Sequence, residues 1–186
     1  MDGLPFANAK DLLPRVANIP APIAANVPRV RTPVPDVTFG LSDTAFARQQ
    51  LLAMIIPPTS SVCEPISSLY WPFFVLEYKA QAKGGSIYVV VNQCAGSGSA
   101  CIKAQAKLKT PADHIPLAFS YAIDDRTAEL LVHHLDESTK YYVSTVHRYL
   151  LADPLHLEHL HRHIHNIIDW GVSSYRDSIC RMLDAQ

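Results

Sequence analysis

Two acidic residues and one lysine occur in an order that suits a metal-dependent hydrolytic site. Asp36 begins the alternating segment PDVTFGL, and Glu77 and Lys79 lie near the end of the apolar segment FFVLEYKA. Successive side chains of a strand point to opposite faces, so one face of the second segment carries Phe73, Val75, Glu77 and Lys79. If the two segments are neighbouring strands, we expect both carboxylates at one end of a sheet.

Two carboxylates suit a hard divalent cation such as Mg²⁺, which keeps water in the rest of its coordination shell. Such an ion lowers the pKa of a bound water and neutralises charge on a phosphoryl oxygen. Lys79 would stabilise the transition state or orient the attacking water. The three residues therefore predict metal-assisted phosphodiester hydrolysis. The alternatives are a partly buried salt bridge between Glu77 and Lys79, and a turn that begins at Asp36.

Pro35-Asp36 followed by Glu77-Tyr78-Lys79 resembles the PD-(D/E)XK signature of the restriction-endonuclease-like superfamily. Longer segments resemble an uncharacterised fungal family of PD-(D/E)XK nuclease-like domains over about residues 30 to 184: VPDVTFGLSDTAF, YWPFFVLEYKAQAKGGSIYVVVNQCAGSGSAC and LEHLHRHIHNIIDWGVSSYRDSICRML. The resemblance implies that Asp36, Glu77 and the backbone carbonyl of Tyr78 bind Mg²⁺ or Mn²⁺. It also implies that Lys79 is the catalytic lysine.

The resemblance adds Gln93 as a supporting polar residue that faces the site from the following helix. The alternative is a glutamine that is hydrogen-bonded to the backbone. The superfamily core has a helix and a strand before the aspartate strand, and that helix often supplies another acid. Here only 35 residues precede Asp36, and their only acids are Asp2 and Asp11. A core trimmed at its N-terminal part is therefore one interpretation, and it leaves open whether the site is catalytic.

The fold expected from the sequence is α+β, with an α/β/α-like, restriction-endonuclease-like arrangement of a central mixed sheet flanked by helices. Residues 1–34 hold six of the 14 prolines and are predicted to be a proline-rich arm, while residues 35–186 form the nuclease-like domain. The remaining predicted strands form a meander and cover residues 116–123, 128–135 and 141–151. One predicted helix is capped by Ser42 or Asp43 and runs to about 55, and the next runs from about 86 to 108. The helix that Asp153 caps and Pro154 opens runs to about Trp170 and ends at Gly171, and the last helix spans about 173 to 184.

Lysines near the predicted site provide a candidate surface for DNA or RNA. Lys103 and Lys107 have helical i,i+4 spacing, and Lys83 lies nearby in the sequence, so these side chains would contact phosphates. An ordinary exposed helix face explains them equally well. The small residues of CAGSGSAC lack the lysine of a phosphate-binding loop, so they favour close packing of the helix on the sheet.

Five histidines in HLEHLHRHIH are the strongest compositional signal: His156, His159, His161, His163 and His165. Pairs at i,i+4 would suit zinc, but there is no HExxH motif. Leucines and isoleucines at helical spacing form the apolar stripe, namely Leu157, Leu160, Ile164 and Ile168. The favoured interpretation is a solvated histidine-rich face.

Composition excludes some classes of protein. The net charge of −1 gives no overall attraction to nucleic acid or anionic membranes, so such binding needs a local basic patch. The four cysteines form no CxxC pair, and no signal peptide or membrane span is predicted, which indicates an intracellular, cytoplasmic or nuclear protein. Besides the nuclease, two functions stay open: a catalytically degenerate fold that binds a partner, and an enzyme of different chemistry that acts on a small molecule.

Overall fold

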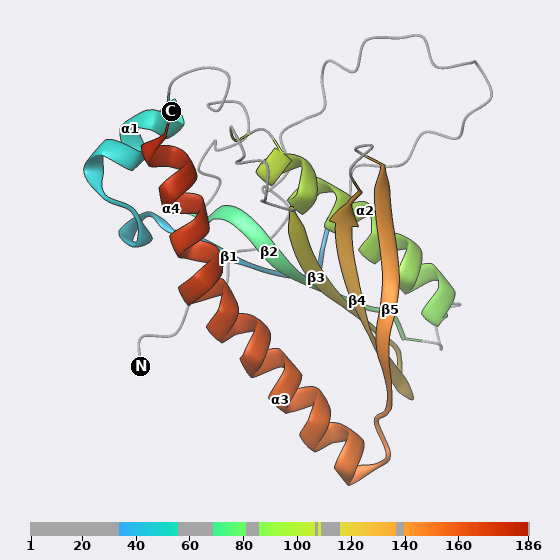
Figure 1. The fold of residues 1–186 in the computed structure, drawn as a ribbon. Helices are drawn as coiled ribbons and strands as arrows, with labels where there is room; N and C mark the ends of the chain where they lie inside the picture. Colours follow the sequence, from blue (N-terminus) through green and yellow to red (C-terminus); the bar gives the residue numbers. More distant parts are fainter. Residues whose placement is uncertain are drawn as a thin grey trace, which may run out of the picture.

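The computed structural model describes residues 34–55, 69–80, 86–106, 108, 116–136 and 140–185. Figure 1 shows a five-stranded mixed sheet with helices on both faces. The predicted α+β class and the α/β/α-like arrangement are therefore confirmed. Most of the predicted N-terminal arm, the loop that contains Cys63, and Lys83 and Lys107 lie outside the described residues.

The strands follow one another across the sheet in chain order, β1-β2-β3-β4-β5. They are β1 (Val37–Ser42), β2 (Leu69–Tyr78), β3 (Leu117–Ile123), β4 (Thr127–Leu135) and β5 (Tyr141–Leu150). All neighbouring pairs are antiparallel except β2 and β3, which run parallel. A parallel connection requires a long crossover, and the helix between these two strands supplies it. The predicted meander of the last three strands is confirmed by the antiparallel β3–β4 and β4–β5 pairs.

Helices follow β1, connect β2 to β3, and close the chain. They are the 3₁₀ turn η2 (Asp43–Ala45), α1 (Arg48–Ile55), α2 (Ile87–Ala106), α3 (Pro154–Trp170), the π-helical turn η4 (Gly171–Tyr175) and α4 (Arg176–Asp184). The first predicted helix is wrong at its start. Phe46 is extended, with φ −119° and ψ 142°, and its buried ring interrupts the helix predicted to begin at Ser42 or Asp43.

The strand β2 begins four residues earlier than predicted and ends at Tyr78. Its first half contains Pro72, which has no N–H for the ladder, and Trp71, whose φ of 48° is in the left-handed region. The pairing with β1 shifts register here, between Phe39 and Leu41. A β-bulge of this kind increases twist and bends the strand. Beyond the bulge, the half of β2 that leads to Glu77 pairs regularly with β1.

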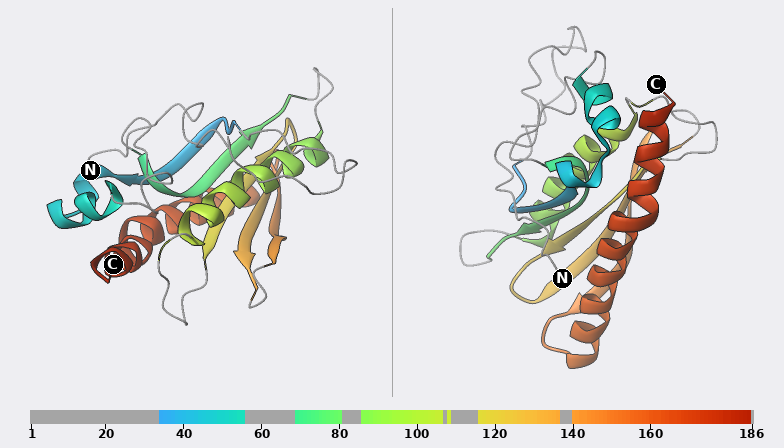
Figure 2. Two further views of the ribbon diagram at one scale, coloured as in Figure 1. Left: turned by 90° about the horizontal axis from the view of Figure 1, so that it is seen from above. Right: turned by 90° about the vertical axis from the view of Figure 1, so that its left-hand side faces the viewer.

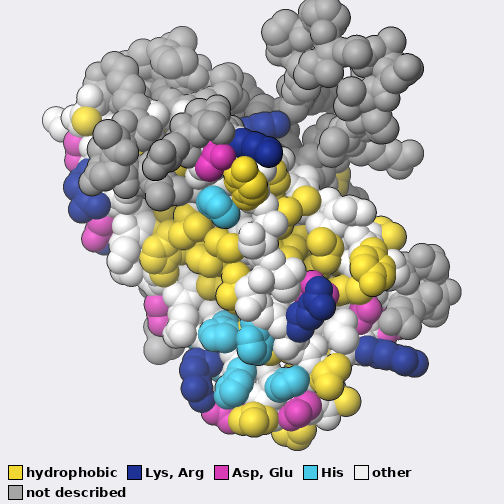
Figure 3. Space-filling model, turned by 45° about the vertical axis from the view of Figure 1, so that its right-hand side comes forward, with side chains coloured by type: hydrophobic (Ala, Val, Ile, Leu, Met, Phe, Trp, Pro, Cys, Tyr) yellow, Lys and Arg dark blue, Asp and Glu magenta, His cyan; other side chains and the backbone are white. Residues whose placement is uncertain are grey.

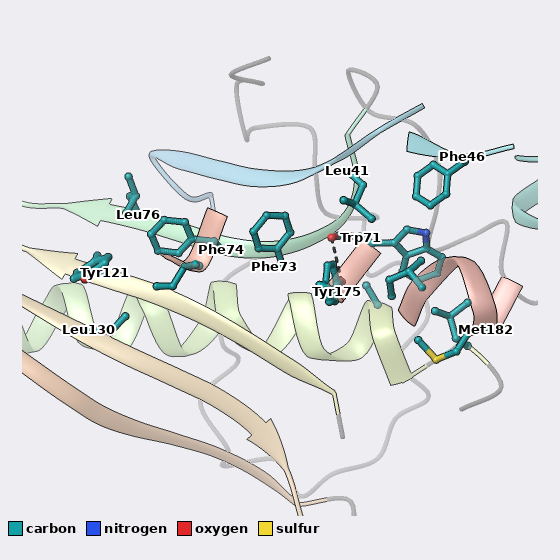
Figure 4. Packing of buried hydrophobic residues seen from close by; sticks show 14 of the residues in the cluster. Leu41, Phe46, Trp71, Phe73, Phe74, Leu76, Tyr121, Leu130, Tyr175 and Met182 are labelled. Carbon is teal, nitrogen blue, oxygen red and sulfur yellow. Dashed lines mark hydrogen bonds between the residues drawn. The ribbon is translucent and has the colours of Figure 1, made fainter. Parts of the chain in front are cut away.

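The two faces of the sheet pack against different helices. On one face, Val75 and Ala118 contact Cys101 and Ile102 of α2. On the other face, a larger apolar cluster joins the sheet to α3, η4 and α4. Figure 4 shows part of that cluster, with the indole of Trp71 among side chains from β1, α4 and the segment that contains Phe46. Phe73 belongs to this larger cluster, whereas Val75 does not. Simple alternation predicts that the two side chains lie on the same face, so this expectation is wrong for Phe73.

The last two helices form one continuous rod, which is clearest in the right-hand view of Figure 2. The side chain of Asp153 accepts hydrogen bonds from the first turn of α3 and Pro154 follows it, as predicted. Gly171 does not end the helix, because its φ of −62° and ψ of −44° are helical. A Cβ atom there would overlap the ring of Phe73, so this position is glycine for close packing on β2.

Among the described residues, no helix is long and apolar enough to cross a membrane.

Candidate active site

Pairing of β1 with β2 brings the predicted aspartate to the predicted glutamate. Val37 pairs with Leu76, so one step further along the antiparallel register Asp36 lies opposite Glu77. The Asp36 carboxylate accepts a hydrogen bond of 2.7 Å from the backbone N–H of Tyr78. The exposed aspartate is thus attached to the backbone between Glu77 and Lys79.

Glu77 is almost completely buried, with 1% of its surface exposed. Its side chain faces α2, where the Ser97 hydroxyl donates a hydrogen bond of 2.6 Å to its Oε1 atom. Burial raises the pKa of Glu77 from 4.5 to about 6. The Ser97 hydrogen bond lowers this pKa, the charge of Asp36 raises it, and the charge of Lys79 lowers it.

Lys79 follows the last residue of β2 and is half-buried. Its backbone N–H donates to the carbonyl of Ile123, which extends the β2–β3 ladder by one bond. Both Asp36 and Lys79 act electrostatically on Glu77. The structure therefore brings these three predicted residues together at one end of the sheet, and no salt bridge joins Glu77 to Lys79 within the described ranges.

Gln93 lies on α2 one helical turn before Ser97, so the two side chains point to the same side of the helix. The Oε1 atom of Gln93 is buried and has no hydrogen-bond partner in the described part of the chain. The alternative, in which the glutamine is hydrogen-bonded to the backbone, is therefore not seen for this oxygen. An acceptor without a partner, one helical turn from the serine that bonds Glu77, suits a site whose water or ligand supplies the missing donor.

The predicted surface for nucleic acid is only partly described. Lys103 is exposed on α2, six residues after Ser97, which corresponds to about 9 Å along a helix axis. Lys83 and Lys107 are outside the described residues. Lys103 is therefore not part of the acidic site, although it lies on the helix that covers it.

The sequence does not reveal Ser97 as a partner of Glu77, because its segment CAGSGSAC predicts only close packing by small residues. That prediction is correct for Gly98, where a Cβ atom would overlap the imidazole of His133. The helix continues through this segment, so the phosphate-loop alternative does not apply. The one feature of the sequence that points to Ser97 is its position one helical turn after Gln93.

A second set of buried polar residues also lies beneath α2. The Tyr141 hydroxyl donates to the carbonyl of Ala95 at 2.9 Å, so it accepts from Nδ1 of His133. Nε2 of His133 then accepts from the Ser120 hydroxyl at 2.7 Å. Burial, followed by the charge of His134, lowers the pKa of His133 to about 4. This buried chain of hydrogen bonds holds α2 on the sheet through a neutral imidazole.

The carboxylate oxygens of Asp36 and Glu77 are ligands of the kind that a hard divalent cation prefers. Asp36 and Glu77 each use one oxygen in a hydrogen bond, and the described residues give the other oxygen none. No group of three or more histidine, cysteine, aspartate or glutamate side chains that could hold a metal occurs among the described residues. A cation at this site would thus keep several waters, which is the usual condition of protein-bound Mg²⁺.

All five histidines of α3 are predicted to lie on a solvated face, but three of them are partly buried: His156, His159 and His163. His163 contacts the Tyr149 hydroxyl through Nδ1, and Nδ1 of His156 accepts from the Leu150 N–H. His161 and His165 are exposed, as predicted. Leu157, which is predicted to belong to the apolar stripe, is 43% exposed, whereas Ile167, which is outside the predicted stripe, is buried.

Fold and site define an α+β protein with an acidic pair and a lysine at one end of a mixed sheet. The chain belongs to the family described as Domain of unknown function (DUF7924), whose model matches residues 4–183. No curated protein and no solved structure matches the chain.

Proposed function

We propose that this protein hydrolyses phosphodiester bonds of nucleic acid with a divalent cation, through a PD-(D/E)XK-type site. The observation that carries the proposal is the hydrogen bond from the Tyr78 N–H to Asp36. It joins the aspartate that precedes β1 to the backbone between Glu77 and Lys79, so the elements of the motif meet in space. The remaining sequence resemblance supports the same assignment, for a protein that acts inside the cell.

Asp36 and Glu77 would hold Mg²⁺ or Mn²⁺, with the Tyr78 carbonyl as a further oxygen ligand. When bound, such an ion neutralises charge on the phosphoryl oxygens and lowers the pKa of a coordinated water. The oxygens of the two carboxylates that have no hydrogen bond within the described ranges are the available ligands. The buried Oε1 atom of Gln93 would accept a hydrogen bond from water at the same place.

The chain's own residues control charge at the site. Glu77, whose pKa is about 6, carries a proton in mildly acidic solution and loses it near neutrality. Because a carboxylate must be ionised to bind a cation, metal binding and cleavage should increase as the pH rises through 6. The Lys79 ammonium would stabilise negative charge on the scissile phosphate. Lys103, with Lys83 and Lys107, would contact phosphates of the flanking nucleotides.

A non-catalytic protein that keeps the fold and binds a partner is the second candidate. The near-complete burial of Glu77 favours it, because a metal ligand that is 1% exposed leaves a bound ion little access to a large substrate. In that case, the hydrogen bonds of Asp36 and Glu77 would serve only to join β1, β2 and α2.

The test is to incubate the purified chain with single-stranded and duplex DNA and RNA, with Mg²⁺, with Mn²⁺, or with a chelator. Cleavage should require the metal and should be abolished by Lys79→Ala. Lys140→Ala is the matched control, because Lys140 precedes β5 at the opposite end of the sheet. Absence of cleavage by the wild type, or cleavage that survives Lys79→Ala, would contradict the proposal, and nucleic-acid binding without cleavage would support the second candidate.

A further inference from the structure

The exposed face of α3 carries two histidines that the packing of the helix does not use. Figure 3 shows histidine side chains gathered on one part of the surface. His156 and His163 are hydrogen-bonded to β5 or its end, and His159 is partly buried. His161 and His165 remain exposed and contact one another.

The two Nε2 atoms of this pair face one another at hydrogen-bond distance. The Nε2 atoms of His161 and His165 are 3.0 Å apart, and their ring centroids are 4.3 Å apart. Imidazole nitrogens bind transition metals at about 2.0–2.1 Å. An ion at that distance from both atoms would have an N–metal–N angle of about 91–97°, by trigonometry on the 3.0 Å separation. This is the angle between adjacent ligands in square-planar and octahedral complexes, the geometries of Cu²⁺ and Ni²⁺.

The helix fixes the spacing before any ion arrives. Both histidines lie in the middle of the 17-residue α3, which is capped at its start by Asp153. The nearest cationic neighbour in sequence, Arg162, forms a 2.6 Å salt bridge with Glu158. That pairing partly neutralises the positive charge beside the two imidazoles, and a preorganised pair loses little conformational freedom on binding.

From this geometry we infer that Nε2 of His161 and Nε2 of His165 bind one Cu²⁺ or Ni²⁺ ion as adjacent ligands. The described residues offer no group of three or more metal-ligating side chains, so water or an external ligand completes the coordination shell. Mg²⁺ prefers oxygen ligands and should not compete for this site. The inference is independent of the proposed nuclease activity.

The pair His159/His163 provides a control at the same i,i+4 spacing. His163 directs Nδ1 to the hydroxyl of Tyr149, and both side chains are partly buried. His159→Gln should therefore leave the chelate unchanged, whereas His165→Gln removes one of its two ligands. Glutamine is a good helix former, so exposed substitutions of this kind keep α3 intact.

The experiment titrates the metal-free full chain with CuCl₂ and with NiCl₂ by calorimetry, and records the Cu²⁺ electron paramagnetic resonance spectrum. The wild type and His159→Gln should bind one ion at this site, with two equatorial nitrogens in the copper spectrum. His165→Gln should weaken binding about tenfold or more, and His161→Gln with His165→Gln should abolish this site. Wild-type affinity in His165→Gln, or an equal loss in His159→Gln, would overturn the inference. Asp36→Asn should have no effect on Cu²⁺ binding, which separates this result from the fate of the proposed nuclease site.

Discussion

Replacement of Glu77 by glutamine should stabilise the protein at neutral pH. The buried carboxylate has its pKa raised from 4.5 to about 6, so the folded state binds a proton more tightly than the unfolded state does. The difference between these two pKa values corresponds to about 2 kcal/mol. At pH 7.5, where Glu77 is ionised in both states, this is the destabilisation that the charge causes. The glutamine amide would keep an oxygen to accept the Ser97 hydrogen bond and would carry no charge.

The sign of the effect follows from proton binding. Between pH 4.5 and 6 the folded protein holds more protons at Glu77, so the contribution of this residue to the free energy of unfolding falls as the pH rises. The stability difference between Glu77→Gln and wild type should be about 2 kcal/mol above pH 7. It should decrease as the pH falls through 6 and approach a constant value near zero below pH 4.5. His133 acts in the opposite direction, because its pKa is lowered to about 4, but it is common to both proteins and cancels in their difference.

The assay is urea unfolding of both proteins in metal-free buffer at a series of pH values. Glu158→Gln is the control, since this exposed carboxylate pairs with Arg162 on the surface of α3 and exposed pairs contribute little. A variant that is less stable than wild type at pH 7.5, or a stability difference that does not change with pH, would refute the reasoning about the burial of Glu77.

Two further substitutions test the packing that positions the site. Ser97→Ala removes the hydroxyl that donates to Glu77 and should destabilise the protein by about 1–3 kcal/mol at pH 7.5. It should also raise the midpoint of the pH dependence of stability that Glu77 causes, because the Ser97 hydrogen bond lowers the pKa of Glu77. An unchanged midpoint would show that the hydrogen bond does not stabilise the ionised form. Gly171→Ala places a Cβ atom against the ring of Phe73 and should cost about 1–3 kcal/mol in thermal or urea unfolding. Val172→Ala, at an exposed neighbouring position, is the control for that change, and equal effects of the two substitutions would contradict the packing argument.

Local patterns predict the strands, and the meeting of Asp36 with Glu77 follows once the pairing of their strands is known. Alternation in PDVTFGL and the apolar segment before Glu77 identify two strands, and their antiparallel pairing places Asp36 opposite Glu77. Sequence spacing does not reveal which residues lie across a helix–sheet interface. For that reason the hydrogen bond from Ser97 to Glu77 is not predictable from the sequence, and neither is the hydrogen-bonded chain that begins at Ser120 and passes through His133.

Boundaries that depend on tertiary packing are predicted less well. Gly171 is expected to end a helix, as glycine often does after the last turn. Here its missing side chain lets Phe73 approach, and the chain continues through a π-helical turn into α4. Likewise, the ring of Phe46 is buried against the core, and this packing overrides the helix-capping signal of Ser42 and Asp43.

The most direct measurement is calorimetric titration of Mg²⁺ and Mn²⁺ into the metal-free full chain at pH 7.5, with Asp36→Asn alongside. The asparagine would keep an oxygen to accept the Tyr78 N–H but would lack the negative charge that attracts the ion. We expect one site in the wild type, loss of that site in Asp36→Asn, and wild-type binding in Glu158→Gln. Absence of binding in the wild type, or equal binding in Asp36→Asn, would contradict the claim that Asp36 and Glu77 jointly hold one cation.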